Sequence, residues 1–120
     1  MGFGPVAIAS LRSMDQSAPG VPGLSIRQVS DRSGEFDVQP PVTDANGDEL
    51  SGLVAAECVV IEAGLDEASL YVADFEAAKS RPDAQVTVID WSEVNDEVAT
   101  RPFNIPNPGK DYTVLARCSD

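Results

Sequence analysis

Short strand-like segments, separated by turn-forming residues about every ten positions, constrain this chain more than any other feature. In the clearest segment, residues 84–91, Val86 and Val88 lie on one face and Thr87 and Ile89 on the other. Similar alternating or continuous apolar stretches occur at 24–29, 36–39, 53–61, 98–105 and 112–116. No apolar stretch is long enough to span a bilayer. The pattern predicts an all-β fold, a sandwich of two packed sheets.

One region fits two kinds of secondary structure. Its apolar residues recur at spacings of three and four, as on one face of a helix: Leu65, Ala68, Val72 and Phe75. Asp66 is a candidate cap for this helix, and Lys79 lies near its end. The alternation of Leu70, Val72 and Asp74 with their neighbours fits a strand equally. We therefore expect one short helix around residues 66–79, or a strand followed by a helical turn.

The N-terminal part of the chain differs from the rest. Val6 and Ile8 occupy alternate positions, and a polar stretch follows. Residues 18–23 contain two prolines and two glycines, which exclude both a helix and a central strand. These features predict an N-terminal arm and linker over residues 1–23, followed by a sandwich domain over residues 24–120.

Two stretches resemble a fibronectin type III domain. The first combines Phe36-x-Val38-Gln-Pro40-Pro41 with the strand-like residues before it, and the second is Pro108-Gly109 followed by Tyr112 and Val114. The resemblance implies an immunoglobulin-like or fibronectin type III-like β-sandwich. It also implies a tyrosine corner, in which the Tyr112 hydroxyl bonds back to the backbone. The chain departs from the family pattern at Val38, where a core Trp is usual, and at Leu53, where a Tyr is usual.

The resemblance places residues 112–116 in the penultimate strand of the family, and the sequence given stops at Asp120. A sandwich without its final strand exposes unpaired backbone groups, and such an edge readily pairs with another strand. The N-terminal segment 6–11 is expected to fold back into this gap, or to be exchanged with a neighbouring subunit. Insertion of a partner's strand and a sheet that simply ends there are the alternatives.

The charge of the chain excludes several classes of partner. The net charge is −12, and only eight residues are Lys or Arg. Nucleic acids and anionic membranes are bound through basic residues, so neither is an expected partner. The N-terminal residues lack the pattern of a signal peptide, which predicts a location in the cytoplasm or in a virus particle.

The side chains that usually carry chemistry are few. There is no His, and Cys58 and Cys118 are far apart, so neither a zinc site nor a Cys–His or Ser–His pair is available. The two cysteines are expected to be reduced and buried unless the fold brings them within bonding distance. The loop 44–49 offers Asp44, Asn46, Asp48 and Glu49 as calcium ligands, but its glycine and glutamate do not fall at EF-hand positions. We expect no enzyme activity, no catalytic residue, no metal and no cofactor.

These observations favour a non-enzymatic structural or assembly protein that binds protein subunits. The form would be a homo-oligomer or part of a multi-subunit particle, for example a phage decoration, cement or tail component. The candidate partner-binding residues are Val6, Ile8, Leu11, Trp91 and Phe103. The last two have an alternative interpretation as core residues. A carbohydrate- or ligand-binding sandwich module is the alternative function, and it would depend on Trp91.

Overall fold

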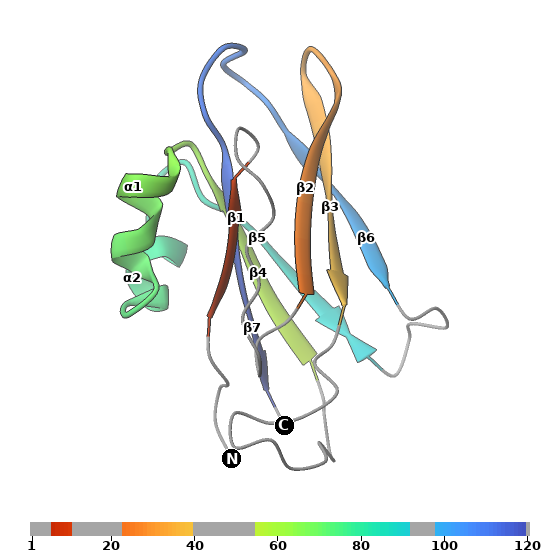
Figure 1. The fold of residues 1–120 in the computed structure, drawn as a ribbon, viewed down its shortest axis with the longest axis vertical. Coiled ribbons are helices and arrows are strands. Elements are labelled where there is room, and N and C mark those ends of the chain that lie inside the picture. The colour runs from red at the N-terminus through yellow and green to blue at the C-terminus, as the bar shows by residue number, and fades with distance from the viewer. Residues whose placement is uncertain (1–5, 11–22, 40–54, 92–97, 120) are drawn as a thin grey trace.

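Two antiparallel sheets form the protein in the computed structural model (Figure 1), which describes residues 6–10, 23–39, 55–91 and 98–119. The four-stranded sheet has the order β1 (Ala7–Ser10), β7 (Thr113–Ser119), β4 (Ala55–Ile61) and β5 (Gln85–Asp90). The three-stranded sheet has the order β2 (Gly23–Ser30), β3 (Ser33–Gln39) and β6 (Ala99–Asn104). The predicted all-β, sandwich-like architecture is confirmed. The described residues contain no helix long and apolar enough to cross a membrane.

The main core lies between the two sheets and takes the inward-facing residues of both. Phe36 and Val38 enter it from β3, Val60 and Ile89 from the facing sheet, and the rings of Phe103 and Tyr112 meet with centroids 6.2 Å apart. The alternation along β3 and β5 thus reflects one buried face per strand, as the sequence predicts. Val38, which also points into this core, is fully buried.

Gly34 illustrates how tightly this core is filled. It pairs with Phe103 across β3 and β6. A Cβ atom at Gly34 would lie 2.4 Å from Cζ of Phe103 and 2.7 Å from the backbone oxygen of Arg27. The phenyl ring therefore occupies the space that a side chain at position 34 would need, and only glycine fits there.

Helical residues cover the outer face of the four-stranded sheet (Figure 1). They form α1 (Leu65–Ala68), the 3-10 turn η1 (Ser69–Tyr71) and α2 (Phe75–Lys79). A second apolar cluster fills the space between these turns and the sheet, and it consists of Val59, Ile61, Ala63, Ala68, Phe75, Ala78 and Leu115. Helical conformation within residues 65–79 is confirmed, and the strand alternative is wrong. Of the predicted helix face, Ala68 and Phe75 are buried, whereas Val72 lies between the helices and is 40% exposed.

The helical region differs from the prediction in its details. There are two short α-helices and not one, and Asp66 lies inside the first turn of α1, where Gly64 is the N-terminal cap. The capping carboxylate is Asp74, which accepts a hydrogen bond of 3.2 Å from the backbone N–H of Ala77 at the start of α2.

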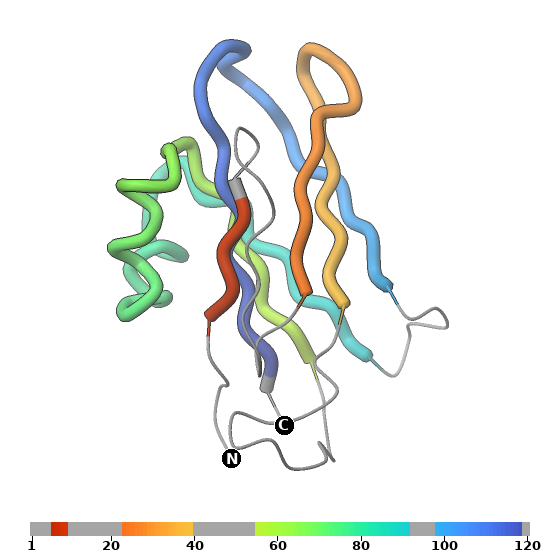
Figure 2. The backbone as a smooth tube through the Cα atoms, viewed as in Figure 1, coloured from red at the N-terminus to blue at the C-terminus, as the bar shows by residue number. Residues whose placement is uncertain are grey.

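The N-terminal segment is a strand of the four-stranded sheet. β1 pairs antiparallel with β7, with Ala7 opposite Ala116 and Ala9 opposite Val114, and the two strands lie side by side in Figure 2. Ala7 and Ala9 point into the main core, whereas Val6 and Ile8 pack against the second apolar cluster. The sequence alone leaves several possibilities open for the edge beside residues 112–116. In the structure, the N-terminal segment folds back and pairs along this edge.

The turn before β7 contains the predicted tyrosine contact. The hydroxyl of Tyr112 accepts a hydrogen bond of 3.0 Å from the backbone N–H of Asn107, and it lies 3.3 Å from the Asn107 carbonyl oxygen. Gly109 allows the chain to turn here because it has a φ of 92°. The Tyr112 ring is buried in the core, so the contact fixes the turn to the sheet.

Candidate interaction surface

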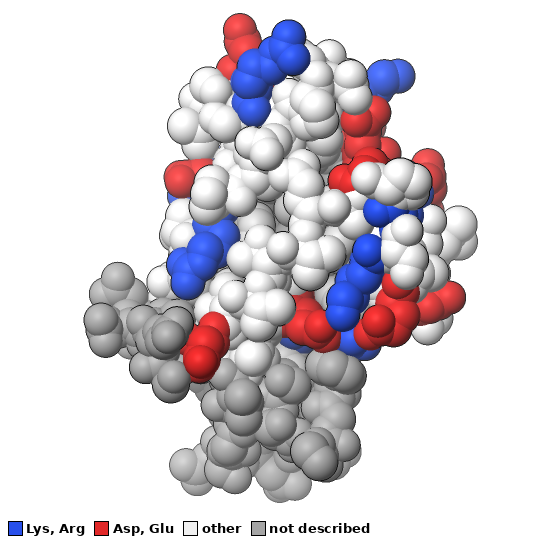
Figure 3. All heavy atoms as spheres, turned by 180° about the vertical axis from the view of Figure 1, so that it is seen from behind, with Lys and Arg blue, Asp and Glu red and all other residues white. Residues whose placement is uncertain are grey.

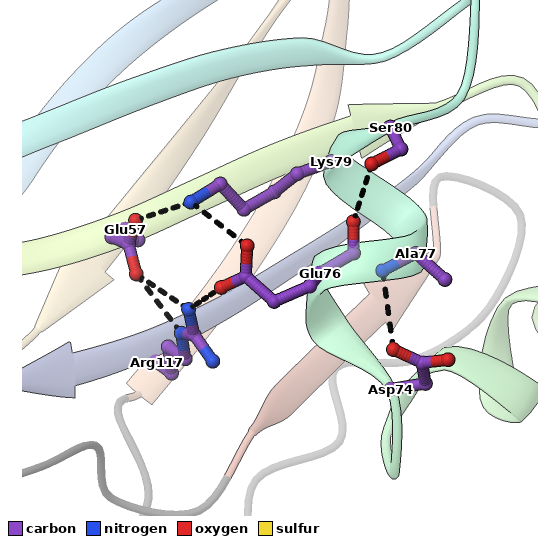
Figure 4. A network of polar contacts seen from close by, with 7 residues as sticks. All are labelled: Glu57, Asp74, Glu76, Ala77, Lys79, Ser80 and Arg117. Carbon is purple, nitrogen blue, oxygen red and sulfur yellow. Dashed lines mark hydrogen bonds and ion pairs between the residues drawn. The ribbon is translucent and has the colours of Figure 1, made fainter.

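An ion-pair network holds α2 against the four-stranded sheet (Figure 4). Glu57 on β4 accepts hydrogen bonds from Lys79 Nζ at 2.7 Å and from Arg117 Nε at 3.0 Å. Arg117 on β7 also pairs with Glu76, and its guanidinium lies 4.3 Å from the centre of the Phe75 ring. Burial alone would raise the pKa of Glu57, but the bonds from Lys79 and Arg117 outweigh it and lower that pKa. The charges of two acidic and two basic groups balance here, which is typical of a network that stabilises the packing of a helix on a sheet.

Two further groups of charges are also paired. Arg81 bonds to Asp83 at 2.9 Å, to Glu67 at 2.8 Å and to the Tyr71 hydroxyl at 3.0 Å. On the outer face of the three-stranded sheet, the cation of Arg27 lies 2.6 Å from both Glu35 and Asp37.

These contacts occupy four of the basic side chains, namely Arg27, Lys79, Arg81 and Arg117. The eight basic residues of the chain are already outnumbered by twenty acidic ones. A macromolecular partner therefore meets a surface on which negative charge prevails.

The described residues contain no cluster of His, Cys, Asp or Glu that could hold a metal ion. The candidate calcium loop 44–49 lies outside the residues that the structure describes. Cys58 and Cys118 are free, buried thiols on neighbouring strands. Burial raises the pKa of Cys58 to about 12 and that of Cys118 to about 11. At neutral pH both remain protonated and therefore unreactive.

The structure separates the five predicted partner-binding residues. Val6 and Ile8 are half-buried beneath the helical layer, where they serve the fold. Phe103 is only 4% exposed and lies in the main core, so its side chain is not available to a partner in this fold. Leu11 lies outside the described residues.

Trp91 is half-buried and packs against the main core at the end of β5. Its indole Nε1 is buried and finds no hydrogen bond of normal geometry among the described residues. It lies close enough to the Cys118 sulfur to oppose the effect of burial on the pKa of that thiol. The Trp91 indole therefore points toward the protein interior and not toward solvent. This placement agrees with the alternative interpretation of Trp91 as a core residue.

With β1 on β7, the edges of the sheets formed by the described strands are β1, β5, β2 and β6. Three of them carry features that hinder further strand pairing. β1 is only four residues long, and β2 has an irregular register between Gln28 and Ser30. β6 contains Pro102, which has no N–H to donate. The backbone N–H and C=O of its Asn104 are bonded to the Gln85 side chain at 2.8 and 2.9 Å.

β5 carries none of these features over its described residues. Its sequence, Gln-Val-Thr-Val-Ile-Asp, has no proline, no lysine and three β-branched apolar residues. Val86 and Val88 lie opposite Val59 and Glu57 of β4 on the outer face of the sheet, and they are 47% and 60% exposed. We call the outward-facing Val86 and Val88, together with the side of β5 that does not pair with β4, the β5 edge.

The surroundings of the β5 edge combine uncharged surface with the ion-pair network, since Val88 lies opposite Glu57. Figure 3 shows the molecule from the side on which β5 and β6 lie, and a band of uncharged surface runs along its middle between charged groups. Comparison with family models, with curated proteins and with solved structures finds no match for this chain.

The β5 edge was not among the predicted partner-binding residues, although its signal is visible in the sequence. The alternation over residues 84–91 separates Val86 and Val88 from Thr87 and Ile89 correctly. The alternation does not say which face is buried, and the structure buries Ile89 and exposes both valines. The helical layer covers the outer face of β4 and β7 and leaves these valines exposed, which the alternation alone does not predict.

Proposed function

We propose that this protein is a non-enzymatic assembly module that binds a protein partner by strand addition at the β5 edge. The observation that carries the proposal is an edge strand with two exposed valines that lacks, over the described part of the chain, the features by which the other described edges are short, irregular or capped. Strand addition uses the backbone for affinity and alternate side-chain positions for specificity. The sequence-based expectation of a subunit in a larger assembly, such as a virus-particle decoration or tail protein, agrees with such an edge.

The same proposal includes the finer fold. The order of the sheets and the Tyr112 contact support an immunoglobulin-like or fibronectin type III-like sandwich. In that interpretation β1 occupies the position of the family's last strand, because it pairs antiparallel with β7 at the outer side of the sheet. The N-terminal segment then stabilises the sandwich, and partner binding falls to the opposite edge of the same sheet.

Comparison of two matched variants tests the proposed function. Val88→Lys places a charge on the β5 edge, whereas Val29→Lys makes the same change at an equally exposed valine (59% against 60%) at the far end of β2. The immobilised wild-type protein and the two variants are exposed to proteins of the source cell, and the retained proteins are compared by mass spectrometry. The expected result is a partner that Val29→Lys retains and Val88→Lys loses, at least tenfold. Equal retention by both variants would contradict the proposal.

A further inference from the structure

The two faces of β5 restrict how any strand can be added to it. Val86 and Val88 belong to the outer face, and Thr87 and Ile89 to the inner face, since their partners on β4 are Val59, Glu57, Cys58 and Ala56. Residues directly opposite each other in an antiparallel pair point to the same face of the sheet. An added strand must therefore present apolar side chains at alternate positions, so that they lie beside the two valines.

A second copy of β5 that runs antiparallel to the first presents apolar side chains at these alternate positions. If Thr87 faces Thr87 of a second copy, then Val86 faces Val88 and Gln85 faces Ile89. All these pairs join residues of the same face, and no carboxylate lies opposite another. Pairs of β-branched residues such as Val–Val and Thr–Thr are favourable across strands.

The neighbouring registers are less suitable. A shift that places Val88 opposite Val88 also places Val86 opposite Asp90, and the opposite shift places Ile89 opposite Asp83. Each brings a carboxylate against a large β-branched side chain, Val86 or Ile89, which costs free energy on desolvation. In the arrangement centred on Thr87, Asp90 lies opposite only the small side chain of Ala84. Asp83 is in addition already bonded to Arg81 and to the backbone N–H of Glu62. The arrangement centred on Thr87 is therefore the favoured one.

We infer that the partner at the β5 edge is a second copy of this chain, paired antiparallel through β5 about a two-fold axis at Thr87. This inference rests on the proposed function and names the partner that the edge takes. The two four-stranded sheets become one continuous sheet, and Val86 and Val88 of both copies form one apolar patch on its outer face. The contact is the same on both copies, so it closes on itself and yields a dimer and not a filament.

The molecular mass in solution tests whether the dimer forms. Sedimentation equilibrium of the wild-type chain should show a concentration-dependent change from monomer to dimer. Val88→Lys should weaken the association at least tenfold and Val29→Lys should leave it unchanged, while circular dichroism verifies that both variants are folded. Because each copy carries a net charge of −12, added salt should strengthen the dimer by screening repulsion. A wild-type mass that stays monomeric over the whole accessible concentration range would overturn the inference.

Cysteine cross-linking tests the register independently of stability. The pairing of Val86 with Val88 predicts that a mixture of Val86→Cys and Val88→Cys proteins forms a disulfide-linked heterodimer under mild oxidation. Each variant alone should cross-link poorly, since two copies of the same position are then offset by two residues along the strands, beyond the roughly 7 Å reach of a disulfide. The native Cys58 and Cys118 are buried and do not interfere. Preferential self-cross-linking of either variant would overturn this register.

The two proposals fail in different ways. A monomeric protein whose Val88→Lys variant still loses a captured partner contradicts the second copy and supports the proposed function. A monomeric protein whose captured partners are unaffected by Val88→Lys contradicts both. A dimer that Val88→Lys disrupts supports both, whether or not another protein is captured.

Discussion

At the scale of single residues, close packing explains several features that composition does not. Gly34 is needed because the Phe103 ring and the backbone of Arg27 take up the space beside its Cα. Tyr112 combines a buried ring with a hydroxyl that bonds to Asn107, which satisfies the polar atom of a core residue. Cys58 and Cys118 behave as small apolar side chains, and burial accounts for their high pKa values.

Substitution of Gly34 tests this packing directly. Gly34→Ala should lower the free energy of unfolding by about 3 kcal/mol, because its Cβ would overlap Phe103 and the backbone of Arg27. Urea denaturation measures the change. Gly23→Ala at the start of β2 is the control, since its Cβ would lie no closer than 3.3 Å to the exposed Gln39 side chain among the described residues. Adding Phe103→Leu to Gly34→Ala should restore part of the stability, and a single variant as stable as the wild type would contradict the steric explanation.

At the scale of elements, two short segments add to the four-stranded sheet. β1 pairs along the edge of β7, and the helical residues 65–79 cover the outer face. β1 supplies pairing partners for β7 and two alanines for the main core. α1, η1 and α2 cover the outer face of β4 and β7, and the network of Glu57, Lys79, Glu76 and Arg117 fixes α2 there. Neither segment is long enough to be stable alone, so both depend on tertiary contacts.

Removal of β1 tests its role as the strand that covers β7. A chain shortened by its first ten residues should be less stable by several kcal/mol and should aggregate, because it exposes the β7 edge and opens the core beside Val114. A synthetic peptide of residues 4–12 should raise the midpoint of thermal unfolding in a concentration-dependent way. A peptide of the same composition in scrambled order is the control. Full stability of the shortened chain would show that β1 is dispensable.

At the scale of the whole molecule, two electrostatic effects act in opposite directions. The ion pairs depend on ionised carboxylates, and the pKa values of Glu57, Asp37 and Asp83 are all lowered in the fold. In each case burial alone would raise the pKa, but hydrogen bonds to the carboxylate outweigh it. The donors are Lys79 and Arg117 for Glu57, Arg27 for Asp37, and Arg81 for Asp83. The net charge of −12 meanwhile destabilises the compact state by self-repulsion, which acidification relieves near the isoelectric point of about 4.1.

The pH dependence of stability follows from these lowered pKa values. A carboxyl group with a lowered pKa stabilises the fold above its unfolded-state pKa, and this stabilisation is lost as the pH falls through the folded-state value. The free energy of unfolding should therefore change little between about pH 8 and 5.5 and fall below about pH 4.5. Glu57→Gln should lower stability at pH 7 and make the acid decline shallower, as measured by denaturation at several pH values. Glu67→Gln, at a more exposed ion pair, is the control, and an unchanged slope for Glu57→Gln would contradict the role of the network.

Much of the fold was predictable because it depends on local patterns. The strands containing Phe36, Val60 and Ile89 were recognisable from alternation or from continuous apolar residues, and Tyr112 after Pro108-Gly109 indicated the hydroxyl contact. The candidate surface was not predictable in the same way. Whether a strand lies at an edge, and whether a second layer covers its outer face, depends on residues distant in sequence.

The sequence by itself determined the all-β class, the position of most strands and the acidic charge, because each follows from local composition and from a period of two. Only the tertiary structure decided which edges are closed. It placed β1 on β7, capped β6 with the Gln85 side chain, and left the valines of β5 in solvent. The physical reason is that periodicity assigns two faces to a strand without saying which neighbour each face meets. That choice is made by the packing of the whole chain.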